Sequence, residues 1–135
     1  MTGTLVYLDS SAIVKLVAAE AESGSLRAWL ADHSDRVTSV IAHVEVRRAL
    51  RRANASRSDL QRAAEIVDRI GLLALERAVI DLAARLDPSD LRSLDAIHLA
   101  SALSLETDLA GLVTYDARLA AAAQAARIEV WSPGA

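Results

Sequence analysis

The chain has 135 residues, no Cys, no Phe, two Tyr and two Trp, and its 15 Lys and Arg against 18 Asp and Glu give a net charge of −3. This length predicts one domain over residues 1–135. The absence of Cys excludes a disulfide framework, a thiolate metal site and a catalytic thiol, and the few aromatic residues leave almost no platform on which bases could stack. Because no apolar stretch reaches the length of a membrane span and no basic region precedes a long apolar run at the N-terminus, we expect a soluble cytoplasmic protein.

The first half of the chain alternates short apolar runs of strand type with segments of helical spacing. Asp9 directly follows the first run, at a turn from strand to helix. In open α/β sheets ligands bind beyond the carboxyl ends of the strands, so Asp9 is a candidate for chemistry, with helix capping as the alternative role. Glu45 lies beside an apolar stripe soon after the second strand, where a surface Glu is the alternative. The expected elements are strands at 5–8 and 36–40 and helices at 12–17, 25–31 and 41–50.

The most uneven charge lies in the segment 47–62, where six Arg stand against one acid, Asp59. Such a run is often only a solvated face, but on an acidic protein it is the one candidate surface for contacting phosphates or an acidic partner. Residues four apart share a helix face. The pairs that do so are Arg47 with Arg51 and Arg48 with Arg52.

The second half continues the alternation and repeats the pattern at Asp9. Ser58-Asp59-Leu60-Gln61 has the form of a capping box, and Asp87-Pro88 stops a later helix. Asp116 follows a strand as Asp9 does. The expected elements are helices at 58–71, 77–86, 93–103 and 118–126, a brief strand or extended link at 72–75, and strands at 111–115 and 128–131.

The helix expected at 93–103 is apolar around most of its circumference, which predicts a buried helix. Asp95 lies in this apolar surrounding and would lose hydration unless it meets a hydrogen-bond donor, a cation or a water-filled cleft. The alternative is that Ser93 or Asp95 caps the helix. His98 lies one turn after Asp95, and whether it packs in the core, supports a site or joins one stays open.

Strands that alternate with helices predict an α/β fold with a mainly parallel central sheet and helices on both faces. In such a sheet Asp9 and Asp116 lie at the same edge, and Glu45 and Asp95 can reach it. Four carboxylates in one cleft repel one another, and Lys15 is the one Lys that could lie near them. A hard divalent cation would therefore be needed to balance their charge. Oxygen ligands without His–His or Cys spacing favour Mg²⁺ or Mn²⁺ over Zn²⁺.

Four motifs carry a resemblance to a known family. They are YLDSSAIVKL at 7–16, EVRRAL at 45–50, LDAIHLA at 94–100 and TYDARL at 114–119. In order and spacing they resemble PIN-domain proteins, specifically the VapC toxins of bacterial type II toxin–antitoxin pairs, from about Leu5 to Trp131. The resemblance implies a PIN-like α/β/α sandwich and a Mg²⁺- or Mn²⁺-dependent endoribonuclease that cleaves RNA, is neutralised by a VapB antitoxin and is usually a homodimer. The helices within 12–30 are the expected antitoxin surface.

The resemblance also implies roles for single residues. It maps the family's acidic quartet onto Asp9, Glu45, Asp95 and Asp116, and its supporting hydroxyls onto Ser10 and Thr114. We expect the three Asp to hold the principal ion, Glu45 to position a second ion or the attacking water, and the hydroxyls to orient ligands or contact phosphate. Some members carry a further acid where this chain has Ala117, Arg118 and Leu119, so one versus two metal ions stays open.

Other functions fit the sequence less well or remain as alternatives. A receiver-like phosphoacceptor would need an early pair of acids and a Lys after a late strand, and neither is present. A phosphatase built on Asp-x-Asp would need a second Asp in Asp9-Ser10-Ser11. A catalytically silent PIN-like domain that only binds a protein partner is the alternative that stays open. The RNA that is cut and the identity of the antitoxin are not encoded in any of these patterns.

Overall fold

The computed structural model of the protein describes residues 3–135. A five-stranded sheet in the order β3-β2-β1-β4-β5 forms its centre, and every neighbouring pair of strands is parallel. The strands are β1 (Leu5–Leu8), β2 (Arg36–Ser39), β3 (Gly71–Leu73), β4 (Leu109–Val113) and β5 (Val130–Trp131). The mainly parallel sheet expected from the sequence is therefore confirmed.

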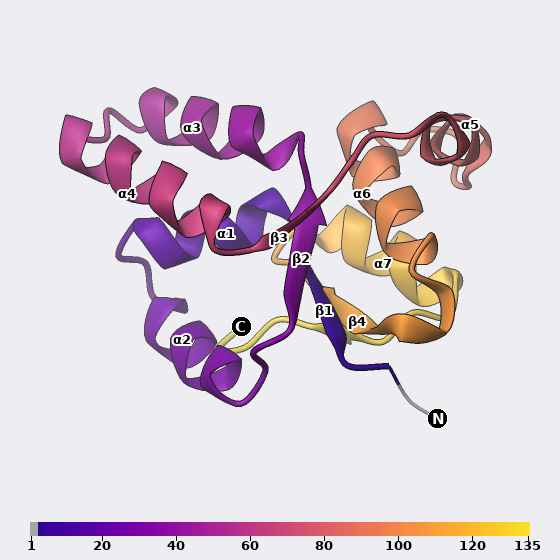
Figure 1. Cartoon of the computed structure of the whole chain (residues 1–135), viewed down its shortest axis with the longest axis horizontal. Helices are drawn as coiled ribbons and strands as arrows, with labels where there is room; N and C mark the ends of the chain where they lie inside the picture. Colours follow the sequence, from indigo (N-terminus) through magenta and orange to yellow (C-terminus); the bar gives the residue numbers. More distant parts are fainter. Residues whose placement is uncertain (1–2) are drawn as a thin grey trace.

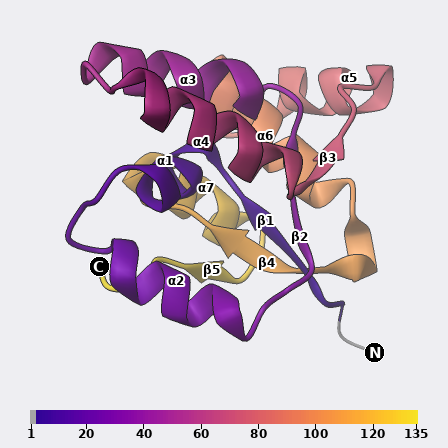
Figure 2. The same cartoon turned by 60° about the vertical axis from the view of Figure 1, so that its left-hand side comes forward.

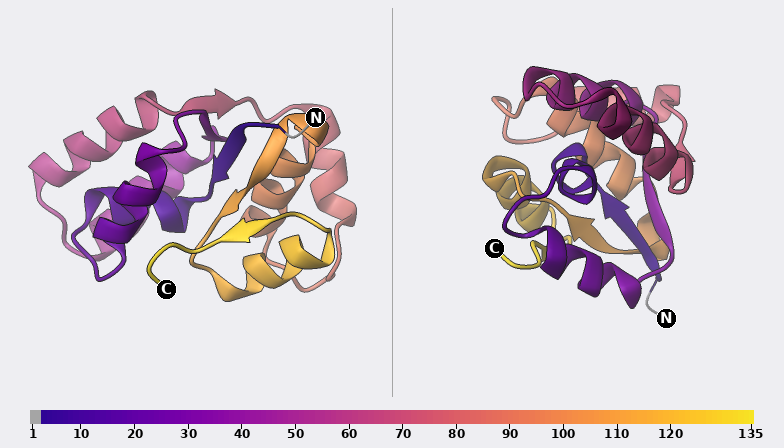
Figure 3. Two further views of the ribbon diagram at one scale, coloured as in Figure 1. Left: turned by 90° about the horizontal axis from the view of Figure 1, so that it is seen from below. Right: turned by 90° about the vertical axis from the view of Figure 1, so that its left-hand side faces the viewer.

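Helices cover both faces of this sheet. They are α1 (Ser10–Val17), α2 (Ser23–Ala31), α3 (Ala42–Arg52), α4 (Arg57–Asp68), α5 (Arg77–Arg85), α6 (Ser93–Leu103) and α7 (Ala117–Ala125), with a short 3-10 helix at Glu106–Asp108. Figure 1 shows α1 to α4 on one side of the sheet and α5 to α7 on the other. The view from below in Figure 3 shows the same three layers. The arrangement confirms the expected α/β/α sandwich.

The central strand β1 explains why the molecule has a core on each side of the sheet. Successive side chains of a strand point to opposite faces. Val6 and Leu8 accordingly pack with α1 to α4, whereas Tyr7 packs with α6 and α7. All three side chains are completely buried. The sequence of a strand that is buried on both faces is an unbroken apolar run, and residues 5–8 have this pattern.

One expected helix cap and one alternative cap are absent from the structure. Helix α4 begins at Arg57, and the Ser56 hydroxyl accepts the backbone N–H of Asp59, so the cap precedes the expected capping box by two residues. Ser56 has the extended backbone that an N-cap requires. Helix α6 covers the expected residues, but its N-cap is Arg92, and neither Ser93 nor Asp95 makes a capping hydrogen bond. Capping therefore does not account for Asp95.

The strand expected at 5–8 and the helix expected at 93–103 agree with the structure, and several other expected boundaries differ by a few residues. β4 ends at Val113 rather than at 115, so Thr114 and Tyr115 separate it from Asp116. The last strand is only Val130–Trp131, and the segment at 72–75 contributes only to the end of the edge strand β3. In Figure 2 the C-terminal end of the chain lies beside α2. Within residues 3–135, no helix combines the length and the apolar character that a membrane crossing requires.

Candidate active site

The four acidic residues predicted to converge line one cavity of about 390 Å³. Asp9 follows β1 and Asp116 precedes α7, so both lie at the carboxyl edge of the parallel sheet. Glu45 comes from the first turn of α3 and Asp95 from the first turn of α6. Parallel strands direct their carboxyl ends to one edge, and this topology brings together acids that are distant in the sequence.

Asp9 is the most buried of the four acids, with 3% of its surface exposed. Its Oδ1 accepts hydrogen bonds from the Ser11 hydroxyl (2.7 Å) and the Ala12 N–H (3.0 Å), and its Oδ2 accepts one from the Thr114 hydroxyl (2.6 Å). Burial raises the pKa of the Asp9 carboxyl, and these hydrogen bonds oppose the rise without cancelling it. Asp9 thus caps α1 and also lines the cavity, so the two predicted roles coexist.

The two hydroxyls expected to support the acids both contact carboxylates. Thr114 is completely buried; it donates to Asp9 and accepts the backbone N–H of Asp116 at 3.0 Å. Ser10 donates to Oε1 of Glu45 at 2.7 Å. Of the two expected roles, orientation of a carboxylate fits Thr114, because a completely buried hydroxyl cannot contact a phosphate.

Glu45 is held by two partners from other elements. Besides Ser10, the imidazole Nε2 of His98 lies 2.6 Å from Glu45 Oε1. Burial alone would raise the pKa of the Glu45 carboxyl, but the hydrogen bonds of His98 and Ser10 hold this pKa below its usual value. His98 is 1% exposed and lines the same cavity. His98 therefore contacts an acid of the cluster.

Asp95 and Asp116 complete the cluster of negative charge. Oδ1 of Asp116 accepts the backbone N–H groups of Arg118 (2.9 Å) and Leu119 (3.1 Å), which caps α7. Burial, followed by the negative charge of Asp116, raises the pKa of the Asp95 carboxyl. Asp9 and Glu45 add to this repulsion. The predicted electrostatic conflict among the four carboxylates is therefore present in the structure.

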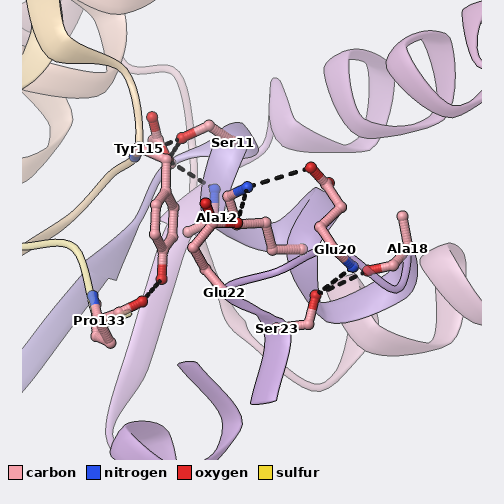
Figure 4. A network of polar contacts seen from close by, with 10 residues as sticks. Ser11, Ala12, Ala18, Glu20, Glu22, Ser23, Tyr115 and Pro133 are labelled. Carbon is pink, nitrogen blue, oxygen red and sulfur yellow. Dashed lines mark hydrogen bonds and ion pairs between the residues drawn. The ribbon is translucent and has the colours of Figure 1, made fainter. Parts of the chain in front are cut away.

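Ser11 is a site residue that the sequence patterns did not reveal. Its hydroxyl donates to Asp9 and accepts the backbone N–H of Tyr115 at 2.9 Å, as Figure 4 shows for the Ser11–Tyr115 pair. The Tyr115 hydroxyl in turn donates to the carbonyl of Pro133 at 2.7 Å. The available signal was the position of Ser11 two residues after Asp9, where a hydroxyl can reach the preceding carboxylate.

Lys15 does not neutralise the acid cluster. Its ammonium group binds Glu20 at 3.2 Å and Glu22 at 2.8 Å and lies 4.8 Å from the centre of the Tyr115 ring. Figure 4 shows the network of polar contacts to which the two Glu side chains and Tyr115 belong. The one Lys of the chain is therefore engaged outside the cavity.

The Arg-rich helix α3 presents only part of its charge to the site. Arg52 lines the acid cavity, and Arg48 and Arg52 line an adjoining cavity of about 270 Å³ that shares Ser10 and Glu45. Arg47 and Arg51 line neither cavity, and the Nε of Arg47 donates to the His43 carbonyl. Arg92, which the sequence analysis did not single out, joins Arg52 in the acid cavity. All these Arg residues are exposed.

The chemistry of the cluster fits a hard divalent cation. Among residues 3–135, no three His, Asp or Glu side chains are already arranged as a set of metal ligands. However, Oε2 of Glu45, Oδ2 of Asp116 and both oxygens of Asp95 accept no hydrogen bond in the described part of the chain. No ion pair in that part joins an Arg to these acids. Free carboxylate oxygens in one cavity are the ligands that Mg²⁺ and Mn²⁺ prefer.

Comparisons with known proteins agree with this geometry. The model of the PIN domain family matches residues 6–125. The chain is 46% identical over 129 residues to Ribonuclease VapC46 of Mycobacterium tuberculosis, covering 95% of this chain and 97% of that protein. The crystal structure of Mycobacterium tuberculosis VapC20, described as a Sarcin-Ricin loop cleaving toxin, superposes with a TM-score of 0.70 at 20% identity, over 87% of this chain and 94% of that one. A toxin–antitoxin complex from Klebsiella pneumoniae gives a TM-score of 0.71 at 19% identity, over 95% and 97% of the two chains. These two structures support the fold.

Proposed function

The chain belongs to the PIN-domain family and, within it, to the VapC ribonucleases, and from this membership we propose that it hydrolyses RNA phosphodiesters with the help of Mg²⁺ or Mn²⁺ as the toxin of a VapBC-type pair. The observation that carries the proposal is the set of four carboxylates in one cavity, none of which makes an ion pair with a Lys or an Arg in the described part of the chain. The proposal includes a single domain acting in the cytoplasm. The four acids that the resemblance implies all line one cavity, which favours an enzyme over a catalytically silent binding module.

The acids of the cavity have different roles in the proposed reaction. Asp9, Asp95 and Asp116 would hold the ion, with Glu45 beside it. A bound Mg²⁺ or Mn²⁺ supplies Lewis-acid polarisation of the phosphoryl group and lowers the pKa of water. Glu45, whose lowered pKa keeps it ionised, can accept a proton from the attacking water.

Removal of divalent metal is expected to stop RNA cleavage. Purified protein incubated with total RNA should cut at defined positions with Mg²⁺ or Mn²⁺ and should be inactive in EDTA, because the repelling carboxylates then lack their counter-charge. Addition of Mn²⁺ beyond the EDTA concentration should restore the same cut sites, mapped by sequencing of the RNA ends. Cleavage that persists in EDTA would refute the metal-dependent mechanism.

Two pairs of Arg on α3 should differ in their contribution to RNA binding. Arg48 and Arg52 line the cavities at the acid cluster, whereas Arg47 and Arg51 line neither. The double variant Arg48→Gln/Arg52→Gln should bind RNA more weakly. It should also lower the slope of log K against log salt by about 1 for each phosphate that these side chains neutralise in the parent.

The matched control is Arg47→Gln/Arg51→Gln, which removes the same charge from the same helix. It should bind RNA nearly as tightly as the parent in a filter-binding titration at several salt concentrations. An equal loss in both double variants would mean that RNA senses only the overall charge of the helix.

We propose a VapB-type antitoxin as the protein partner, and the exposed apolar side chains favour a contact surface other than the helices within 12–30. Within 12–30, side chains such as Ile13, Leu26 and Leu30 are buried in the core and offer little apolar surface. By contrast, Val44 is 60% exposed and Leu94 is 47% exposed, and both line the cavity adjoining the acids. An antitoxin segment at this rim could place a cationic side chain in the acid cluster, in competition with metal.

We also retain the homodimer as a proposal. Val40, Leu72 and Leu75 are exposed apolar side chains beside the edge strand β3, where the backbone N–H of Val40 donates to the carbonyl of Leu73. Exposed apolar groups beside an open sheet edge favour association with another chain.

A further inference from the structure

A line of hydrogen bonds connects the buried core to the acid cavity through His98. The Tyr7 hydroxyl lies 2.7 Å from His98 Nδ1, and His98 Nε2 lies 2.6 Å from Glu45 Oε1. Ser10 Oγ lies 3.3 Å from the same Nε2. The residues come from β1, α6, α3 and α1, so the line crosses from the sheet to the catalytic edge. Tyr7 and His98 are both buried, at 0% and 1% exposure.

The chemistry of its neighbours selects one tautomer of His98. An ionised Glu45 carboxylate can only accept hydrogen bonds, so Nε2 must carry a hydrogen and donate it. In a neutral imidazole Nδ1 is then an acceptor, and the Tyr7 hydroxyl facing it is the donor. Burial raises the pKa of the Tyr7 hydroxyl, so this donor keeps its proton over the ordinary pH range.

Glu45 needs a hydrogen-bond partner such as His98, because two nearby Arg side chains can compete for its carboxylate. It is half-buried in the first turn of α3, and Arg48 lies one turn further along the same helix. Oppositely charged side chains three residues apart can pair on a helix surface. Arg52 lines the same cavity as Glu45. Without His98, only the Ser10 hydroxyl would hold the Glu45 carboxylate in place against these two guanidinium groups.

We propose that His98 is a positioning residue for Glu45, held in a single tautomer by Tyr7. The His98 imidazole fixes one carboxylate oxygen of Glu45, so that the other oxygen is directed at the space shared with Asp9, Asp95 and Asp116. This inference rests on the proposed function only in giving Glu45 a metal or a water to act on. The hydrogen-bond line itself is a property of the fold.

Three variants separate the parts of this arrangement. His98→Leu keeps an apolar side chain in the buried position but removes both hydrogen bonds. His98→Gln keeps an amide N–H that can donate to Glu45 in place of Nε2. Tyr7→Phe keeps the aromatic ring and removes only the hydroxyl. The matched control is His33→Gln, because His33 stacks on Trp29 at 3.7 Å and does not line the acid cavity.

The experiment measures Mn²⁺ affinity by isothermal titration calorimetry on metal-free protein, together with kcat and KM for RNA. All measurements are made at a temperature where circular dichroism shows every variant folded. His98→Leu should weaken Mn²⁺ binding and lower kcat, each by about 10–100-fold, with little change in KM. His98→Gln should recover most of the Mn²⁺ affinity and of kcat. For both quantities, Tyr7→Phe should lie between His98→Leu and the parent, and His33→Gln should match the parent.

Two results would overturn the inference. The first is His98→Leu that melts at a lower temperature but keeps the Mn²⁺ affinity and kcat of the parent, as a purely structural residue would. The second is His98→Gln that behaves no better than Leu, because the donated hydrogen bond would then be irrelevant. A parent protein that binds Mn²⁺ without cutting RNA would refute the proposed function, whereas weaker Mn²⁺ binding by His98→Leu would still support the positioning role.

Discussion

Asp95→Asn is expected to abolish RNA cleavage while raising the melting temperature of the metal-free protein. Burial and the charges of Asp116, Asp9 and Glu45 raise the pKa of Asp95, so removing its charge relieves repulsion in the folded state. The same change removes a ligand for the ion. Metal ions contribute several kcal/mol to such reactions, which at about 1.4 kcal/mol per factor of ten corresponds to a loss of roughly a thousandfold or more.

The sign of the pH dependence follows from the raised pKa. A carboxyl group with a folded-state pKa above its unfolded value stabilises the fold below the unfolded pKa, and this stabilisation is lost as the pH rises through the folded pKa. The metal-free parent should therefore lose stability as the pH rises through the carboxylate range. The Asp95→Asn variant should lose less stability over the same pH range, and added Mg²⁺ should stabilise it less than it stabilises the parent.

Thermal melts in EDTA and in Mg²⁺ at several pH values, run beside the RNA assay, measure these effects. Asp90→Asn is the matched control, because it removes one charge from an exposed residue close to α6. It should remain active and should melt near the parent. An Asp95→Asn protein that cuts RNA, or that melts below the parent without metal, would contradict the claim that Asp95 belongs to a metal-binding cluster of carboxylates.

Thr114→Val is expected to destabilise the protein by about 1.5–3 kcal/mol, the usual worth of a hydrogen bond to a charged group. The change keeps the shape of a completely buried side chain but removes its hydroxyl. Oδ2 of Asp9 then loses its donor at 2.6 Å, and the backbone N–H of Asp116 loses its acceptor at 3.0 Å. Both effects fall on candidate metal ligands, so RNA cleavage should also decrease.

The destabilisation by Thr114→Val should depend on pH. The Thr114 hydroxyl opposes the rise in the Asp9 pKa, so its removal should raise that pKa further. The variant should then lose more stability than the parent as the pH rises through the carboxylate range, because a neutral Asp9 is less costly to bury. Urea unfolding at low and neutral pH measures the difference. Thr114→Ser keeps the hydroxyl and should remain near the parent. A loss in Thr114→Val that does not change with pH would show that packing, rather than the bond to Asp9, is responsible.

The acids were predictable because their positions follow from simple topology. Asp9 and Asp116 follow strands of a parallel sheet, whose carboxyl ends share an edge. Asp95 stood out as a charge in an apolar helix. The fold class followed from the alternation of strands and helices, although the bounds of β4, β5 and α4 differed by several residues.

The supporting contacts were not predictable, because they depend on how distant elements pack. Tyr7 and His98 are 91 residues apart and meet only because α6 lies against the face of β1 that carries Tyr7. Ser10 and Thr114 could each have met substrate or a carboxylate, and burial decided the role of Thr114. Arg92 enters the cavity because it is the N-cap of α6, a position that no charge pattern marked.

The location of a bound ion tests the central claim most directly. Crystals soaked in Mn²⁺ should show an anomalous difference peak, measured at the manganese absorption edge, between the carboxylates of Asp9, Asp95 and Asp116. The same soak of Asp95→Asn should give a weaker peak or none. An ordered Mn²⁺ elsewhere on the protein, with no peak among these carboxylates at saturating Mn²⁺, would contradict the claim that the acid cluster is a metal centre.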